Sequence, residues 1–229
     1  EVGITVGDFA AALQGERSAL KLRASGPPIK VAFDGSYSMR PTVKVVGSVS
    51  ADAPSLRRAM IWAGQKPLAG GGFGLFSLKA QTNVVGGTIA LTGVNLELDG
   101  NVAEGVLTFA TDGRQTLQGT LASDSIDLSP YLSTIRLMAD REREWNRAPI
   151  ALDGLTTVDL DLRISAAKLA VAGTKAGRTA VGLNLRDGNL TLTIGESQAF
   201  GGVIRGSLAL SRLQNGASLK SQLQFSNVD

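Results

Sequence analysis

The chain of 229 residues is 43% hydrophobic but only 5% aromatic, so we expect a sizeable core built mainly from aliphatic side chains. Its net charge of +3 comes from scattered basic residues rather than from the clustered basic face of a nucleic-acid-binding protein. Because it contains no Cys and no His, disulfides, thiolate or imidazole metal ligands and Ser-His triads are excluded. We therefore expect a protein that is not an enzyme and binds neither a cofactor nor nucleic acid, with carboxylate, Lys or Tyr chemistry left open.

The first half of the sequence alternates strand candidates with glycine-rich turns. Further strand candidates, punctuated by Asp-Gly and Gly-Gly turns, are Ile29–Phe33, Thr42–Ser50, Phe73–Val85 and Thr88–Leu98. Helices are few. Asp8–Gln14 predicts one or two helical turns, and Pro54–Ala63 predicts another short helix, with Asp52 ahead of it as a cap and Gly64 behind it as a stop.

The longest helix candidate, Ser129–Asn146, separates two β-rich parts of the chain. Pro130 suits its first turn, because a proline there gives up no helical hydrogen bond. Pro149 then marks a boundary. We expect residues 1–148 to form an N-terminal β-rich region with short helices. Residues 149–229 should form a C-terminal antiparallel β region whose sheet continues the first.

The second half gives the clearest strand patterns. In Val158–Ile164 every second residue is apolar, which predicts a strand with one buried and one wet face. Val181–Ile194 predicts a hairpin around a two-residue Asp187-Gly188 turn. That turn pairs like with like: Leu185 with Leu190, Asn184 with Thr191, Leu183 with Leu192 and Val181 with Ile194. Val203–Leu210 predicts a further strand.

One segment recurs three times, because Val45–Leu56, Leu117–Leu128 and Leu219–Asp229 align without gaps. The first two copies run into a helix candidate, so the repeating unit is strand, turn, strand and short helix. We therefore predict a mainly β fold, in which repeated antiparallel β-meanders form a curved, groove-like sheet with a few short α-helices. By the same scheme, the intact protein should continue past Asp229 into a short amphipathic helix.

Three motifs suggest chemistry, and each has a simpler explanation. Ser18–Lys21 fits the S-x-x-K pattern of penicillin-binding proteins, but the S-D-N and K-T-G elements are missing. Asp159 and Asp161 fit a D-x-D metal pattern, yet Arg163 continues the row as on any polar strand face. Gly70–Gly74 lacks the Gly-Lys-Ser/Thr of a phosphate loop. We predict no catalytic residue and no metal site.

The β-rich segments share a characteristic pattern, which is carried by Val94–Gly100, Gly105–Phe109, Ile126–Tyr131, Asp159–Ala166 and Phe200–Leu208. The pattern resembles the AsmA family over nearly all of the chain from about Gly47 onward. The resemblance implies a periplasmic region of an inner-membrane-anchored envelope protein, with the anchor outside this sequence, since no run of 18 apolar residues occurs. It also implies a role in outer-membrane biogenesis and, as in the family's long relatives, passage of phospholipid along a hydrophobic β groove.

The resemblance and the alternation together predict a lipid-binding face without Trp, Tyr or Phe. Its residues are Val158, Leu160, Leu162, Ile164, Leu183, Leu185, Leu190, Leu192 and Ile194. The expected partner is phospholipid or another membrane lipid. The alternative is a structural or adaptor module that binds other envelope proteins through exposed strand edges. Period-two alternation is the same for an open groove and for a closed core.

Overall fold

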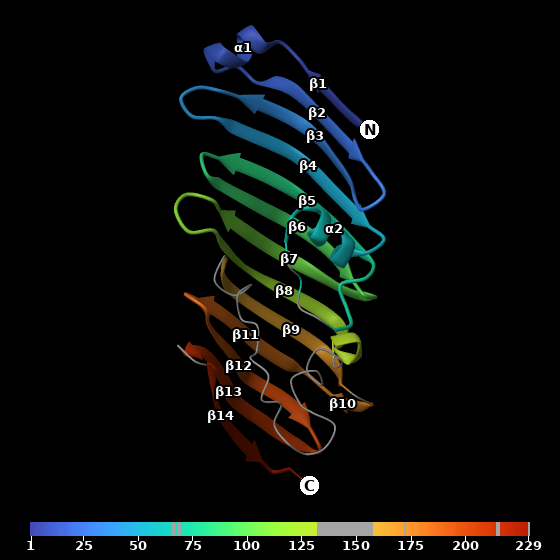
Figure 1. The fold of residues 1–229 in the computed structure, drawn as a ribbon, viewed down its shortest axis with the longest axis vertical. Coiled ribbons are helices and arrows are strands. Elements are labelled where there is room, and N and C mark those ends of the chain that lie inside the picture. The colour runs from blue at the N-terminus through green and yellow to red at the C-terminus, as the bar shows by residue number, and fades with distance from the viewer. Residues whose placement is uncertain (66, 68–69, 132–157, 172, 214–215, 229) are drawn as a thin grey trace. The chain divides into compact units, whose positions relative to one another are not determined.

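The computed structural model describes residues 1–65, 67, 70–131, 158–171, 173–213 and 216–228 (Figure 1). It confirms the mainly β prediction, because strands make up 67% of the described residues, which also contain two short α-helices. Two compact units emerge: unit 1 comprises residues 1–65 and 73–115, and unit 2 comprises residues 66–72 and 116–229. The boundary predicted near residue 148 lies outside the described residues. No helix in the described part is long and apolar enough to cross a membrane.

Unit 1 is an antiparallel meander of seven strands that pair in sequence order (Figure 1). The strands are β1 (Val2–Val6), β2 (Ser18–Ser25), β3 (Lys30–Ser38), β4 (Lys44–Ala53), β5 (Phe76–Val85), β6 (Thr88–Leu98) and β7 (Asn101–Ala110). The sequence predicted β3 to β6 but not β1 or β2. Both missed strands are short and alternate, with Val2, Ile4 and Val6 on one face of β1.

Two helices punctuate unit 1. The helix α1 (Phe9–Gln14) is predicted correctly: the Asp8 carboxylate accepts the Ala11 amide as its N-cap, and Gly15 ends it in the left-handed conformation. The helix α2 (Leu56–Trp62) starts from Ser55, whose hydroxyl accepts the Arg58 amide at 3.3 Å. The prediction that Asp52 would cap α2 is wrong, because Asp52 still belongs to β4, where it lies opposite Ser77 of β5.

The unit 1 sheet contains β-bulges and one close approach between two paired strands. The register shifts between Lys79 and Gln81 against β6, and the extra residue of such a bulge increases local twist. On the neighbouring strands Gly35 and Gly47 lie opposite each other, and the tip of the Phe33 ring lies over both. A Cβ at Gly47 would lie 2.6 Å from the Gly35 Cα, so this close approach of β3 and β4 requires glycine.

Unit 2 pairs six strands in the order β8, β9, β11, β12, β13 and β14, with β10 attached to β9. Their bounds are β8 (Thr116–Asp127), β9 (Asp159–Val171), β10 (Thr174–Ala176), β11 (Thr179–Arg186), β12 (Asn189–Ala199), β13 (Gly202–Leu213) and β14 (Gly216–Ser226). All pairs are antiparallel except β8 with β9. That parallel pair departs from the predicted meander and requires a crossover connection, for which residues 128–158 provide the length.

The predicted helix Ser129–Asn146 is described only at its start. Ser129–Tyr131 forms one 3-10 turn, η1. The Ser129 amide and hydroxyl both donate to the Asp127 carboxylate, which holds the pKa of this exposed Asp127 below its ordinary value. Residues 132–157 lie outside the described part, so the rest of the helix stays a prediction.

Candidate functional site

The nine predicted face residues lie on or beside three consecutive strands of unit 2. Val158 directly precedes β9, and the other eight belong to β9, β11 and β12. The β11–β12 register confirms all four predicted hairpin pairs. The structure adds the partner on the other side of β11, because Leu160, Leu162 and Ile164 of β9 lie opposite Leu185, Leu183 and Val181. Directly opposed residues share a face of a sheet, so the structure brings these side chains together.

The register extends this apolar face over six strands in three rows. We call these rows the unit 2 face, and the residues run from β8 to β14. The first row is Leu117, Leu160, Leu185, Leu190, Leu210 and Leu219; the second is Gly119, Leu162, Leu183, Leu192, Leu208 and Ser221; the third is Leu121, Ile164, Val181, Ile194, Gly206 and Leu223. Ten of these positions were missing from the predicted site.

The sequence held a signal for six of the missed positions. The second and third copies of the repeat place Leu117, Gly119 and Leu121 in β8 and Leu219, Ser221 and Leu223 in β14. In both copies the middle position is a small residue on the apolar face. The first copy has Gly47 at the same place in β4 of unit 1. The repeat therefore marks the apolar face as well as the strands.

Exposure varies strongly across the unit 2 face. Leu185 is 3% exposed, whereas Leu219 and Leu223 on the last strand, β14, are 52% and 50% exposed. Most of the remaining leucines of β9, β11 and β12 are half-buried. The rows are therefore best covered at their centre and most exposed at β13 and β14, where Leu208, Leu219 and Leu223 form an exposed aliphatic patch of the kind found at binding surfaces.

The opposite face of the same strands is polar. Asp161 and Asn184 lie opposite each other on it and are exposed, and Thr191 follows on β12. Asp159 accepts the Asp187 amide at 3.3 Å, which ties the hairpin turn to β9. No group of acidic residues within the described ranges could hold a metal ion. Asp159 and Asp161 belong to a polar strand face, and the absence of a metal site there stays a prediction.

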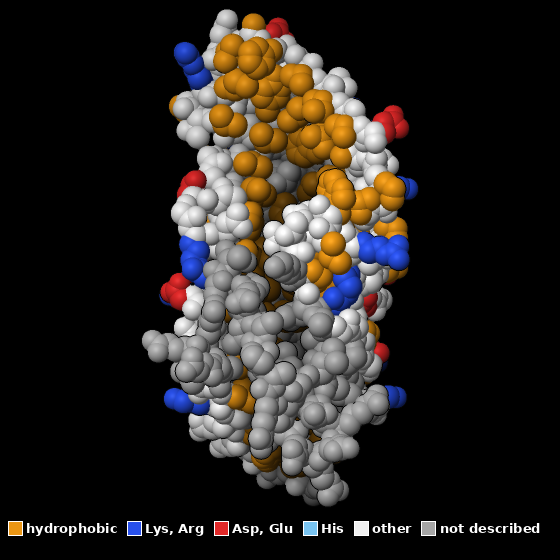
Figure 2. Space-filling model, viewed as in Figure 1, with side chains coloured by type: hydrophobic (Ala, Val, Ile, Leu, Met, Phe, Trp, Pro, Cys, Tyr) orange, Lys and Arg blue, Asp and Glu red, His pale blue; other side chains and the backbone are white. Residues whose placement is uncertain are grey.

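Unit 1 carries an apolar face of its own, which the sequence reasoning did not include in the site. Its longest rows are Ala24, Val31, Ala51, Leu78, Leu96 and Ala103, then Leu20, Gly35, Gly47, Thr82, Leu91 and Leu107, and finally Ser18, Tyr37, Val45, Val84, Ile89 and Phe109. Figure 2 shows apolar side chains gathered over these strands around a hollow. We call these rows the unit 1 face.

Two hydroxyls are buried at one end of the unit 1 face. Ser18 and Tyr37 are directly opposed on β2 and β3, and they are 6% and 7% exposed. Neither hydroxyl has a hydrogen-bond partner within the part of the chain that the structure describes. An unsatisfied buried hydroxyl costs about 1–3 kcal/mol. This pair is therefore a polar and energetically costly end to an otherwise apolar surface.

The structure explains two of the motifs that suggested chemistry. Ser18 and Lys21 are three residues apart on β2, so their side chains lie on opposite faces and cannot form an S-x-x-K pair. In the glycine-rich segment, the amides of Phe73 and Gly74 donate to the Asp99 carboxylate at 2.8 and 2.7 Å. Because Asp99 occupies these donors, the segment is a loop anchored by a carboxylate rather than a phosphate cradle.

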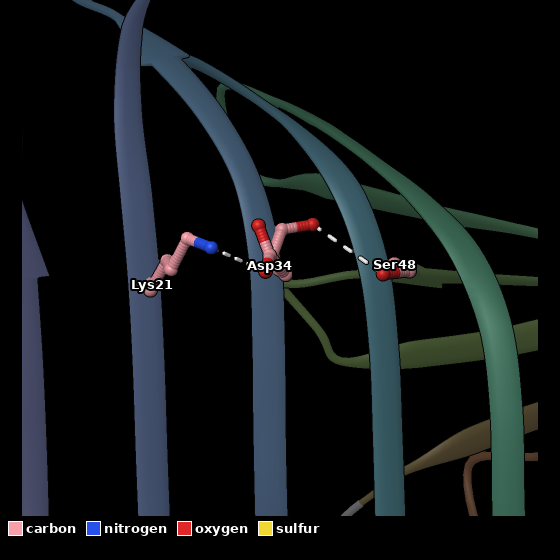
Figure 3. A network of polar contacts seen from close by, with 3 residues as sticks. All are labelled: Lys21, Asp34 and Ser48. Carbon is pink, nitrogen blue, oxygen red and sulfur yellow. Dashed lines mark hydrogen bonds and ion pairs between the residues drawn. The ribbon is translucent and has the colours of Figure 1, made fainter.

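The polar face of unit 1 has a shallow depression of about 380 Å³ lined by Lys21, Arg23, Asp34, Ser48 and Lys79, among others. Figure 3 shows the row at its centre, in which Lys21 pairs with Asp34 at 2.9 Å and the Ser48 hydroxyl donates to the Asp34 carbonyl at 3.4 Å. Both charged side chains are more than half exposed. Exposed pairs of this kind contribute little to stability, so the row is an ordinary solvated face.

Comparison with known proteins adds no relative: no family model matches the chain, and no curated protein or solved structure matches it either. The resemblance to the AsmA family therefore stays a prediction.

Proposed function

We propose that this chain is the periplasmic region of a non-enzymatic envelope protein that binds phospholipid and passes it along an apolar sheet face during outer-membrane biogenesis. The observation that supports the proposal is the unit 2 face, whose three rows run in register over six strands. The resemblance of the sequence to the AsmA family supports the compartment and the inner-membrane anchor.

The dimensions of the unit 2 face suit an acyl chain. Five spacings separate β8 from β14, which at about 4.8 Å each gives roughly 24 Å. The acyl chains of one leaflet occupy only about 15 Å, half of the hydrocarbon core of a bilayer. Each buried methylene contributes about 0.8 kcal/mol, so even a partly covered chain would bind usefully. No aromatic side chain in the rows fills the space above the sheet.

The second candidate is an adaptor that recruits other envelope proteins by strand addition. One observation favours it: Val2, Ile4 and Val6 of β1 are all exposed, at 71%, 60% and 47%, and β1 ends the unit 1 sheet. An edge strand with an exposed apolar face is a template for a partner strand. In this alternative the apolar rows are closed cores, and lipid does not enter them.

Site-specific photocrosslinking to phospholipid, with the photoreactive group on the protein, tests the first proposal. A photoreactive amino acid at Leu192, on the unit 2 face, should form phospholipid adducts, whereas the same probe at the neighbouring Thr193, on the opposite face, should not. In a second experiment the phospholipid carries a diazirine and the protein carries no probe. Leu162→Asp and Leu192→Asp should then abolish the adducts that the unsubstituted protein forms, because a desolvated charge without a partner costs several kcal/mol. Asp161→Ala, on the polar face, should leave them intact.

Circular dichroism of each variant separates loss of binding from loss of folding. Because the aspartate substitutions could unfold unit 2, the proposal is judged by the comparison of the probes at Leu192 and Thr193. A folded protein that forms no adduct from Leu192 would contradict the proposal and move the adaptor function to first place.

A further inference from the structure

The helix α2 has an unusual outward face. Leu56, Ala59 and Met60 form its inner side, and Ala59 is 5% exposed. Arg58, Ile61 and Trp62 follow the i, i+3, i+4 spacing that places side chains on one side of a helix, and this side points outward. Ile61 is 59% exposed and Trp62 is 71% exposed. Figure 2 shows apolar side chains beside basic ones over this helix.

The outward face is presented by a well-anchored helix. The Leu56 and Arg57 amides donate to the carbonyls of Gly74 and Phe73, both at 2.7 Å. The Phe73 and Gly74 amides are in turn fixed by Asp99. The Arg57 guanidinium lies 5.5 Å from the centroid of the Phe73 ring, a cation–π distance. Trp62 is therefore exposed on a fixed element.

Tryptophan and isoleucine beside arginine are the side chains of a membrane-interface helix. The amphipathic indole prefers the headgroup level, and arginine attracts anionic headgroups. The helix has two arginines and no acidic residue. Charge and apolarity on this face therefore both complement an anionic lipid surface.

The size of the face favours a lipid surface over a protein partner. Seven residues at about 1.5 Å each make a helix of roughly 10 Å, which is far smaller than the ~800 Å² patch per partner of a standard protein interface. Insertion into a headgroup layer needs only a few apolar side chains beside cations.

We propose that the outward face of α2, formed by Arg58, Ile61 and Trp62, docks this protein onto an anionic phospholipid surface. This docking is separate from acyl-chain binding on the unit 2 face. It brings the protein to the membrane, whereas the apolar rows hold lipid that has left the membrane.

Tryptophan fluorescence tests the docking directly, because the chain has only two tryptophans, Trp62 and Trp145. In the 229-residue chain with Trp145→Phe, Trp62 is the sole tryptophan. Adding phosphatidylglycerol vesicles should shift its emission to the blue, and lipids brominated near the headgroup should quench it. Pure phosphatidylcholine vesicles should give a much weaker response, and added salt should reverse the response to anionic vesicles.

Flotation with the same vesicles measures the contribution of each side chain. Trp62→Ala should lower the partition coefficient at least about tenfold, and Arg58→Glu should lower it about tenfold. Lys44→Glu makes the same change in net charge at the far end of β4 and should have little effect. Phe200→Ala removes an exposed aromatic of unit 2 and should also have little effect.

Three results would overturn the docking. Emission of Trp62 that is already blue in buffer and unchanged by vesicles would mean that another part of the protein covers it. Vesicle binding that survives Trp62→Ala would place the contact elsewhere. Equal binding to anionic and zwitterionic vesicles would remove the role of Arg58. Because Leu162→Asp should leave flotation unchanged, failure of docking and failure of acyl-chain binding are distinguishable.

Discussion

Both units have an apolar sheet face, but the two faces are built from different side chains. In unit 1 the apolar face contains rings, because Phe33, Tyr37 and Phe109 all point to it, and the Phe33 ring packs against Gly35 and Gly47. In unit 2 the three rows contain only aliphatic and small residues, and the same face carries a ring at its β14 edge, where Phe225 follows Leu223 and is 58% exposed. Rings fill the space above a sheet, whereas short aliphatic side chains leave it available. This difference supports the proposal that acyl chains bind to unit 2 rather than to unit 1.

The largest expected effect follows from removing a ring from unit 1. Phe33→Ala should lower the free energy of unfolding by about 3 kcal/mol, because it deletes a large side chain and leaves the glycine pair uncovered. The matched change in unit 2, Leu192→Ala, removes a smaller side chain from a half-buried position and should cost only about 1–2 kcal/mol. Urea titration followed by circular dichroism measures both. Equal costs would undermine the distinction between the two faces.

A smaller effect is expected where unit 1 strands approach closely. Gly47→Ala should destabilise by about 2 kcal/mol, since the new methyl would meet the Gly35 Cα at 2.6 Å, the Asp34 carbonyl oxygen and the Phe33 ring. Gly182 of unit 2 is the control, because a Cβ there would meet only the Thr193 Cβ, at 3.9 Å. Gly182→Ala should be neutral or stabilise by about 0.4–1 kcal/mol. If both variants melt alike, the close approach is not a constraint.

The smallest effect concerns the buried hydroxyl pair. Tyr37→Phe removes an unsatisfied hydroxyl and keeps the ring, so the free energy of unfolding should rise by about 1 kcal/mol. Thermal melting of the two proteins measures the change. A loss of stability instead would show that the Tyr37 hydroxyl has a partner in solution, which would make this end of the unit 1 face less closed than the comparison implies.

Local patterns could be predicted from the sequence, and long-range pairing could not. The β11–β12 register followed from a two-residue turn and from matching apolar positions, because a register slip of one residue would invert both faces. Nothing local specifies that β9 pairs with β11 on one side and runs parallel to β8 on the other. These pairings depend on which apolar faces can be buried together across a long connection.

In the candidate site, too, the local pattern was predictable and the long-range pairing was not. The nine residues chosen from β9, β11 and β12 share one face, as the alternation predicted, but the rows continue into β8, β13 and β14. The helix cap was wrong for a related reason. Asp52 and Ser55 are both good caps, and only the length of the β4–β5 ladder, which holds Asp52 opposite Ser77, decides between them.

Mapping phospholipid adducts over the whole chain tests the central claim most directly. Wild-type protein is loaded with a photoactivatable phospholipid, irradiated and digested, and the modified peptides are identified by mass spectrometry. The account predicts adducts on β9, β11, β12 and β13, at residues of the unit 2 face such as Leu162, Leu192 and Leu208. Adducts confined to unit 1, or none at all from folded protein, would contradict it.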